Sequence, residues 1–106
     1  MKIFYTDYEE NNSAENPIDL SIEKAISSFY NLSSAKGNFW GILINDNLTL
    51  QFMAIENECW EADIPIVKEK GSYQKLCNYD ECISLIKAIY ANKNWTIPEA
   101  FGFKKW

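Results

Sequence analysis

NFWGILINDNLTLQFMAIENECWEADIPIV, residues 38–67, contains three apolar runs separated by two short polar breaks. The first run, residues 39–44, is apolar almost throughout, which is typical of a strand that is covered on both faces or lies at the centre of a sheet. The second and third runs, residues 48–54 and 60–66, alternate between apolar and polar side chains, as do strands with one face on a core. Because both breaks contain Asn, which suits tight turns, the stretch predicts a three-stranded antiparallel meander.

The third strand of this meander has one apolar face and one acidic face. The apolar face holds Trp60, Ala62, Ile64 and Ile66, and the other face holds Cys59, Glu61 and Asp63. Alternate residues of a strand lie about 6.6 Å apart, so the carboxylates of Glu61 and Asp63 are expected to project side by side toward solvent. We call these two residues, with Glu56 and Glu58 in the preceding turn, the acidic stripe.

The segment before the meander predicts one strand, one loop and one helix. Residues 2–8 are a short strand candidate, and residues 9–17, EENNSAENP, are polar and predict a mobile loop. Ser21 is a suitable N-cap for a helix. The helix should bury one face, made of Ile22, Ala25, Ile26, Phe29 and Tyr30.

The segment after the meander predicts a fourth strand and a second helix. Residues 72–77 should form a strand at the sheet edge, where Lys75 would oppose pairing with another chain. Asn78 and Glu81 have the spacing of a capping box, which predicts a helix start. Residues 95–106 form a C-terminal tail that is too aromatic to lie free in water.

These elements predict an α+β fold: a two-layer sandwich in which two helices cover one face of an antiparallel sheet of four to five strands. The length of 106 residues suits a single domain, residues 1–106, and 47% hydrophobic residues exclude disorder. No run approaches the about 18 apolar residues of a membrane span, and the N-terminus does not resemble a secretory signal. The chain is therefore expected in the cytoplasm.

The charges of the chain are segregated. Residues 1–23 hold six acidic residues and one lysine, residues 37–67 hold five acidic residues and no base, and residues 68–106 hold seven lysines and four acidic residues. There is no arginine and no histidine. Because phosphate neutralisation supplies most nucleic-acid affinity, this pattern argues against direct nucleic-acid binding and favours a basic protein partner.

The chemical alternatives to a binding role are weak in this sequence. Glu61 and Asp63 could act as an acid–base pair or hold a hard cation, but no histidine is present to relay a proton. The three cysteines, Cys59, Cys77 and Cys82, are an odd number at irregular spacing, which predicts reduced, mostly buried thiols. Cys77 and Cys82 flank a helix start that could lower a thiol pKa, although their periodicity indicates core positions. The sequence predicts no catalytic site, no cofactor and no metal site.

Six residues are candidates for partner contact: Glu56, Glu58, Glu61, Asp63, Asp46 and Trp106. Asp46 lies in the opposite turn of the meander and is expected to matter less than the acidic stripe. Trp106 either closes over the core or inserts into a groove of the partner.

Four segments together resemble small immunity proteins of bacterial polymorphic-toxin systems, in particular those of contact-dependent growth inhibition. These segments are FWGILINDNLTLQFM, CWEADIPIV, KGSYQKL and DECISLIKAIY, which all fall within residues 20–92. The resemblance implies a cytoplasmic, non-enzymatic protein that binds the toxin domain of its own system, often a nuclease with a basic cleft, and blocks it. An acidic face could then occupy the place of the phosphate backbone.

Two other functions also fit the sequence. An adaptor module without a toxin partner would suit the same acidic surface. A small-ligand-binding domain would need a concave pocket with converging polar groups.

Overall fold

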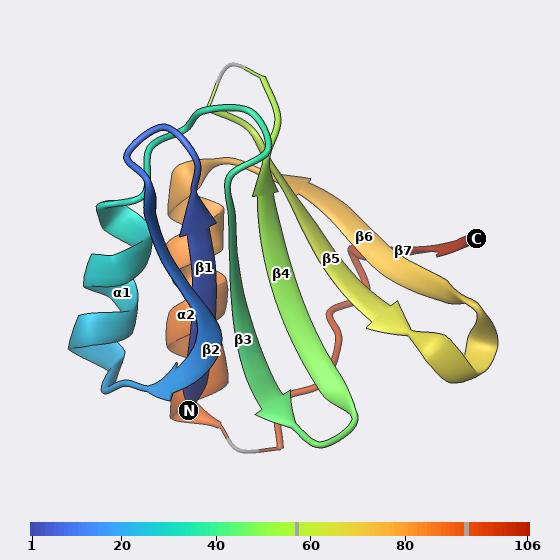
Figure 1. The fold of residues 1–106 in the computed structure, drawn as a ribbon. Helices are drawn as coiled ribbons and strands as arrows, with labels where there is room; N and C mark the ends of the chain where they lie inside the picture. Colours follow the sequence, from blue (N-terminus) through green and yellow to red (C-terminus); the bar gives the residue numbers. More distant parts are fainter. Residues whose placement is uncertain (57, 93) are drawn as a thin grey trace.

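An antiparallel sheet with helices on one face organises the chain (Figure 1). The computed structural model describes residues 1–56, 58–92 and 94–106, and these residues form seven strands in the order β2-β1-β3-β4-β5-β6-β7. The strands are β1 Lys2–Asp7, β2 Asn12–Asp19, β3 Phe39–Asn45, β4 Leu48–Ala54, β5 Trp60–Ile66, β6 Gly71–Cys77 and β7 Gly102–Lys105. The helices are α1 Ile22–Tyr30 and α2 Tyr79–Ala91, with a 3-10 turn, η1, at Val67–Glu69.

The meander predicted from residues 38–67 is confirmed as β3, β4 and β5. Trp40 pairs with Phe52, and Phe52 pairs with Ala62, so the three side chains lie in one row across the sheet. All three are fully buried, and the rings of Trp40 and Phe52 pack against Phe29 of α1, so this row lies on the face that the helices cover. The core therefore lies between this face and the two helices, as the α+β prediction requires.

Both helices begin at the residues that the sequence predicts. The Ser21 side chain accepts a hydrogen bond from the Lys24 backbone N–H at 3.3 Å. At α2 the capping box is complete: Asn78 Oδ1 accepts from the Glu81 N–H at 2.8 Å, and Glu81 Oε1 accepts from the Asn78 N–H at 2.9 Å. Each bond satisfies a backbone donor that a helix start would otherwise leave without a partner.

Replacing Asn78 with Ala should lower the free energy of unfolding by about 0.5–2 kcal/mol, because it removes the acceptor at the start of α2. Urea unfolding followed by circular dichroism measures the change. Ser84→Ala, at an exposed position of the same helix, is the control and should change stability by less than about 0.5 kcal/mol. Equal effects of the two substitutions would contradict the capping role of Asn78.

The prediction of a mobile loop at residues 9–17 is wrong, and so is the strand number of four to five. Residues 12–19 form β2, which pairs with β1, and residues 102–105 form β7, which pairs with β6. Both are edge strands whose side chains are almost all exposed. Because solvent lies on both of their faces, they carry no alternation of apolar and polar residues from which a strand could be predicted.

The presence of β7 also corrects the prediction for residues 72–77. β6 lies inside the sheet between β5 and β7, not at its edge. Lys75 points to the helix side and forms an ion pair with Glu81 of α2, with a distance of 2.8 Å from Nζ to Oε2. On α1, Tyr30 is 70% exposed and does not belong to the buried face predicted for that helix.

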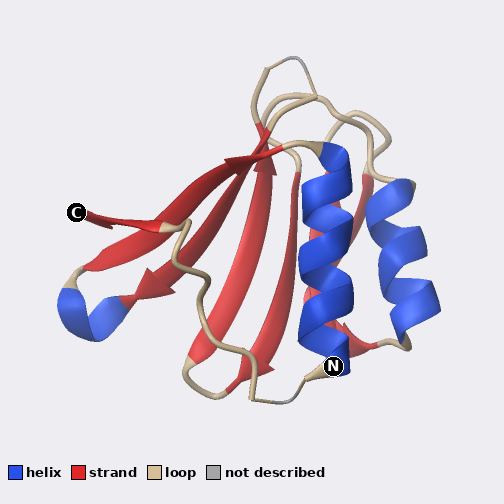
Figure 2. Ribbon diagram, turned by 180° about the vertical axis from the view of Figure 1, so that it is seen from behind, coloured by secondary structure: helices blue, strands red, loops and turns tan. Residues whose placement is uncertain are grey.

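The C-terminal tail crosses the same face of the sheet as the helices before it enters β7 (Figure 2). Phe101 is buried, and Trp95 and Ile97 pack against the core at its border. Trp106 is 67% exposed, so the indole does not close over the core. Asn57 and Lys93, predicted in the second break of the meander and at the end of α2, lie outside the described residues.

No helix within the described ranges is long and apolar enough to cross a membrane.

Candidate partner-binding face

The sheet face opposite the helices is not covered by any other element in the described part of the chain, and we call it the open face (Figure 1). One row across it follows from the strand register: Phe39 pairs with Met53, Met53 with Glu61, and Glu61 with Leu76. Met53 is 49% exposed and Leu76 is 60% exposed. Glu61 of the acidic stripe therefore lies between two exposed apolar side chains.

The next row of the open face is more polar. Gln51 pairs with Asp63, and Asp63 pairs with Gln74. At the β1 side this row continues to Gly41, over which the ring of Phe4 lies so closely that a Cβ at residue 41 would collide with it. The open face thus carries Phe4 with Lys2 and Thr6 over β1, Phe39 over β3, and the carboxylates of Glu61 and Asp63 over β5.

Glu61 and Asp63 are half-buried by their neighbours on the sheet rather than fully exposed. Within the residues that the structure describes, no lysine lies within ion-pair distance of either carboxylate. The two negative charges are thus fixed on rigid strand backbone without a compensating cation. A basic partner could supply that cation and exclude water from the pair at the same time.

Glu56 and Glu58, the other two residues of the acidic stripe, lie in the exposed turn between β4 and β5, before Glu61. Glu56 Oε1 is 3.9 Å from Lys36 Nζ, and both side chains are 77% exposed, so this ion pair contributes little to stability. Glu58 adopts a left-handed backbone conformation with φ of 58°. The four acidic residues therefore lie in succession along one strand and its preceding turn, as the sequence predicts.

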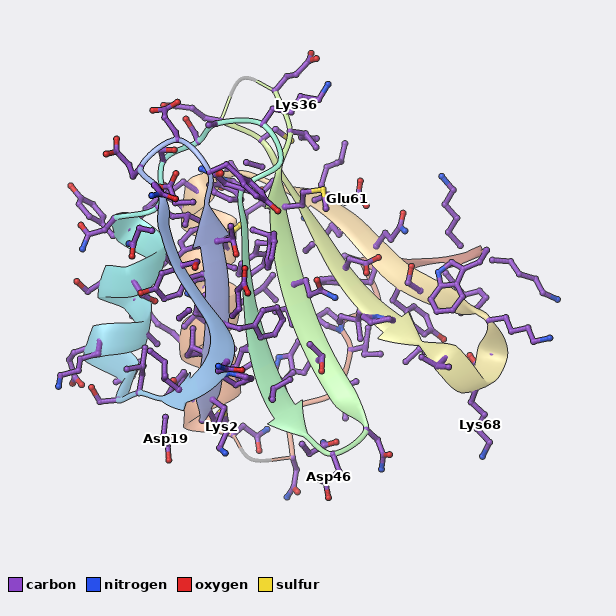
Figure 3. All side chains as sticks on the ribbon, viewed as in Figure 1. Lys2, Asp19, Lys36, Asp46, Glu61 and Lys68 are labelled. Atoms are coloured by element: carbon purple, nitrogen blue, oxygen red, sulfur yellow. The ribbon has the colours of Figure 1, made fainter. Side chains whose placement is uncertain are left out.

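Asp46 and Trp106 do not join the acidic stripe. Asp46 lies in the turn between β3 and β4, at the opposite end of the sheet from Glu61 (Figure 3). There it lines a groove of about 670 Å³ with Thr49, Pro65 and Lys68. Trp106 follows β7, where its backbone N–H donates to the Lys70 carbonyl oxygen at 2.9 Å. Thr49 and Pro65 lie two residues from Gln51 and Asp63 on β4 and β5, so the groove at Asp46 continues the open face beyond Asp63.

Sequence reasoning missed Met53 and Leu76 as candidate contact residues. The alternation of β4 already places Met53 on the same face as Gln51, opposite the buried Phe52. Leu76 could have been found only through the register between β5 and β6, which the sequence does not give. Exposed apolar side chains such as that of Met53 are enriched at protein–protein interfaces.

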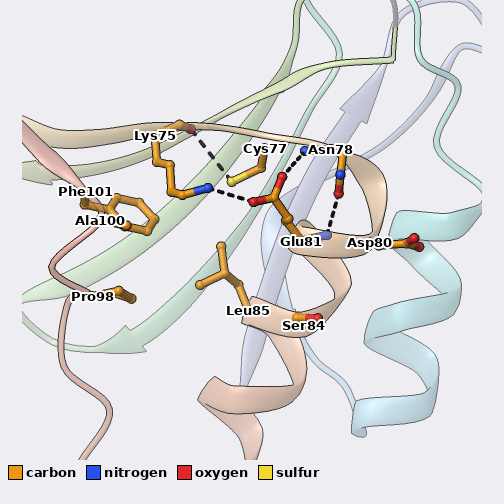
Figure 4. Close-up of a pocket in the computed structure, with 10 residues that line it drawn as sticks. All are labelled: Lys75, Cys77, Asn78, Asp80, Glu81, Ser84, Leu85, Pro98, Ala100 and Phe101. Carbon is orange, nitrogen blue, oxygen red and sulfur yellow. Dashed lines mark hydrogen bonds and ion pairs between the residues drawn. The ribbon is translucent and has the colours of Figure 1, made fainter.

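A cavity of about 330 Å³ lies on the helix side, between β6, the start of α2 and the C-terminal tail (Figure 4). The hydrogen bond to Glu81 raises the pKa of Lys75, although burial opposes the shift. The hydrogen bond from the Asn78 backbone, followed by that from Lys75, lowers the pKa of Glu81. The Lys75–Glu81 ion pair thus stays charged at neutral pH and forms part of the cavity wall.

A second group that sequence reasoning missed is the buried carboxylate of Asp7. Asp7 is 1% exposed, and it accepts hydrogen bonds from Ser33 and from Asn38 Nδ2, the latter at 2.8 Å. Asn38 Oδ1 in turn accepts from the Tyr8 N–H at 2.7 Å. This network joins the β1–β2 turn to the α1–β3 loop, and it supports the fold rather than a reaction.

No family model, no curated protein and no solved structure matches this chain. Among the described residues, no three His, Cys, Asp or Glu side chains are grouped so that they could hold a metal ion.

Proposed function

We propose that this chain is an immunity protein, which binds the toxin domain of its own polymorphic-toxin or contact-dependent growth inhibition system in the cytoplasm. The toxin domain in this proposal is a nuclease with a basic cleft, and the open face of the sheet blocks that cleft. The observation that carries the proposal is the row Met53, Glu61 and Leu76 on the open face. It combines exposed apolar area with a carboxylate that has no ion-pair partner among the described residues.

The arrangement of this face suits inhibition of a nuclease better than general adhesion. Glu61 and Asp63 lie two residues apart on β5, so their separation of about 6.6 Å is close to that of successive phosphates on a nucleic-acid strand. Lysine and arginine side chains that hold phosphates in a nuclease cleft would meet carboxylates at matching intervals. Met53 and Leu76 would add apolar contact area, which stabilises the complex after the charges have steered the encounter.

The direct test is co-expression of the tagged chain with the C-terminal domain of the secreted protein encoded beside it. We expect the two to co-purify, the chain to suppress the nuclease activity of the purified domain, and cells that express both to grow. A neighbouring domain that neither binds nor is inhibited would overturn the proposal. A stable complex without any effect on a toxic activity would instead indicate an adaptor module.

The double charge reversal Glu61→Lys and Asp63→Lys tests the face itself. We expect it to raise the dissociation constant of the complex by about tenfold to hundredfold, because two attractive charges become repulsive. Titration calorimetry at two salt concentrations measures this, and the loss should be larger at low salt. Unfolding of the variant checks that the fold is retained.

The control for this experiment makes the same change in net charge at a distant position. Glu10→Lys and Glu15→Lys alter two exposed residues of the β1–β2 hairpin, at the other edge of the sheet. If the control weakens binding as much as the reversal on β5, general electrostatic attraction explains the affinity and the open face is not the contact surface.

A further inference from the structure

A second pocket, of about 420 Å³, lies at the end of the molecule where α1 ends, α2 begins and the chain turns from β4 into β5 (Figure 1). Half of its lining residues are aromatic, one is acidic, and none of those that the structure describes is a lysine. We call it the aromatic pocket, and its lining residues are Tyr30, Leu32, Ser34, Glu58, Trp60 and Tyr79.

Packing against the core holds the walls of the aromatic pocket in place. The Tyr79 ring stacks on the buried Phe29 ring, with centroids 5.5 Å apart and 20° between the ring planes. The Tyr30 ring stands at 77° to the Tyr79 ring, with centroids 6.2 Å apart. Trp60, which is 3% exposed, is the most deeply buried residue of the lining, whereas Tyr30 is 70% exposed and keeps ring surface open to a ligand. Because these walls are already formed, little ordering is needed when a ligand binds.

The charges around the aromatic pocket are mainly negative. Within the described residues, no lysine lies within ion-pair distance of the Glu58 carboxylate, and Lys36 of the α1–β3 loop pairs with Glu56 instead. α1 ends beside the pocket without a basic residue in its last turn, so the partial negative charge of its C-terminus is not offset there. The partial positive charge at the start of α2 is offset by Asp80 and Glu81. The pocket therefore attracts a cation and repels an anion such as phosphate.

Aromatic rings beside a carboxylate suit an organic cation. A cation within about 6 Å of a ring centroid is attracted by the negative face of the ring. An apolar side chain would take water away from Glu58 without supplying a partner for its charge. Among the cationic side chains, the guanidinium group of arginine is planar, is more weakly hydrated than the ammonium group of lysine, stacks on aromatic rings and donates two hydrogen bonds to one carboxylate. Arginine therefore fits this pocket better than lysine.

We propose that the aromatic pocket binds the guanidinium group of one arginine side chain of the toxin domain. Naming the toxin domain as the source of the arginine rests on the proposed function, whereas the choice of a guanidinium group rests on the pocket alone. Glu58 belongs both to the pocket and to the acidic stripe. A partner that covers Glu61 and Asp63 on the open face thus reaches the pocket around the end of β5, and the arginine anchors it there.

Titration of the isotope-labelled chain alone with N-acetyl-arginine methylamide, followed by NMR, tests the pocket without the toxin domain. At constant ionic strength we expect a saturable shift of the ring signals of Tyr30, Trp60 and Tyr79. The matched citrulline compound has the same shape without the charge and should bind at least about fivefold more weakly. The matched lysine compound should also bind more weakly than the arginine compound. No saturable shift of these rings, or equal binding of the arginine compound and either of the other two, would overturn the proposal.

Two substitutions test the walls of the pocket one at a time. Tyr30→Ala removes the exposed ring, and Glu58→Gln removes the charge but keeps the size of the side chain. Each should weaken binding of the arginine compound at least about threefold. The matched controls are Tyr8→Ala, at a tyrosine that is 68% exposed in the β1–β2 hairpin, and Glu15→Gln, at an exposed residue of β2. The controls should leave the affinity unchanged, and an equal loss in the controls would overturn the proposal.

Binding of the purified toxin domain separates this inference from the proposed function. Tyr30→Ala should raise the dissociation constant of the complex at least about threefold. If it leaves the complex unchanged while the double reversal of Glu61 and Asp63 weakens it, the proposed function stands and the toxin domain does not supply the arginine. If the domain does not bind the parent chain although the arginine compound does, the proposed function is wrong and the guanidinium selectivity of the pocket stands.

Discussion

Replacing Phe29 with Ala should lower the free energy of unfolding by about 3–5 kcal/mol, which is a large part of the stability of a domain of this size. The Phe29 ring is 1% exposed and lies at the centre of an aromatic cluster. Its centroid is 5.8 Å from that of Trp40, 5.4 Å from Phe52, 4.8 Å from Trp60 and 5.5 Å from Tyr79. The substitution would remove contacts that join α1 to three strands and to α2 at once.

Chemical unfolding of the parent and the variant measures this effect. Tyr30→Ala is the matched control, because it removes a neighbouring aromatic residue of α1 that is 70% exposed. We expect the control to change stability by less than about 1 kcal/mol, since little of its surface leaves water on folding. A loss below about 1 kcal/mol for Phe29→Ala would mean that the core does not depend on this cluster.

Replacing Asp7 with Asn should cost about 2–4 kcal/mol, although the side chain keeps its size. The Asp7 carboxylate accepts five hydrogen bonds: from the backbone N–H groups of Glu9, Glu10 and Ser33, from Ser33 Oγ and from Asn38 Nδ2. All of its partners are donors. An Asn amide would turn one acceptor oxygen into a donor that faces these donors in a buried site, and at least one of them would lose its partner.

The same carboxylate makes stability depend on pH. Burial raises the pKa of Asp7, but the hydrogen bonds from Ser33, Glu10 and Asn38 together outweigh burial and hold the pKa below its usual value. Because the folded state has the lower pKa, the stabilisation is fully present above the unfolded value of about 3.9. It is lost as the pH falls through the lower pKa of the folded state.

Unfolding by urea at several pH values between neutral and strongly acidic measures this contribution. We expect the difference in stability between the parent and Asp7→Asn to shrink as the solution becomes acidic. Asp46→Asn, in an exposed turn, is the control and should follow the parent. A difference that stays constant over the whole range would show that the charge of Asp7 does not stabilise the fold.

The elements that could be predicted from the sequence are those that pack one face against the core. β3, β4, β5, α1 and α2 each leave a periodic apolar pattern, and Ser21 and Asn78 mark the helix starts by their local capping chemistry. β2 and β7 leave no such pattern because their stability comes from backbone pairing with a neighbour that lies elsewhere in the chain. The sequence places Lys75 at a sheet edge for the same reason, because the pairing of β7 with β6 leaves no pattern in it.

The candidate face could be predicted only in part. The acidic stripe is local in sequence, so its residues follow from the alternation of a single strand. The apolar neighbours of Glu61 belong to β4 and β6, and they reach it only through the register of three strands. The Asp7 network also depends on loops that are far apart in the sequence and meet in space, so no single segment predicts it.

The two edge strands carry opposite charges, and this affects how copies of the chain can aggregate. β2 holds Glu15 and Asp19, whereas β7 holds Lys104 and Lys105. Like charges therefore oppose pairing of β2 with β2, or of β7 with β7, when two molecules meet edge to edge. Pairing of β2 with the β7 of another copy meets no such repulsion and would propagate into a filament. At that junction Pro17, which has no backbone N–H to donate, is the residue of β2 that interrupts the growing ladder.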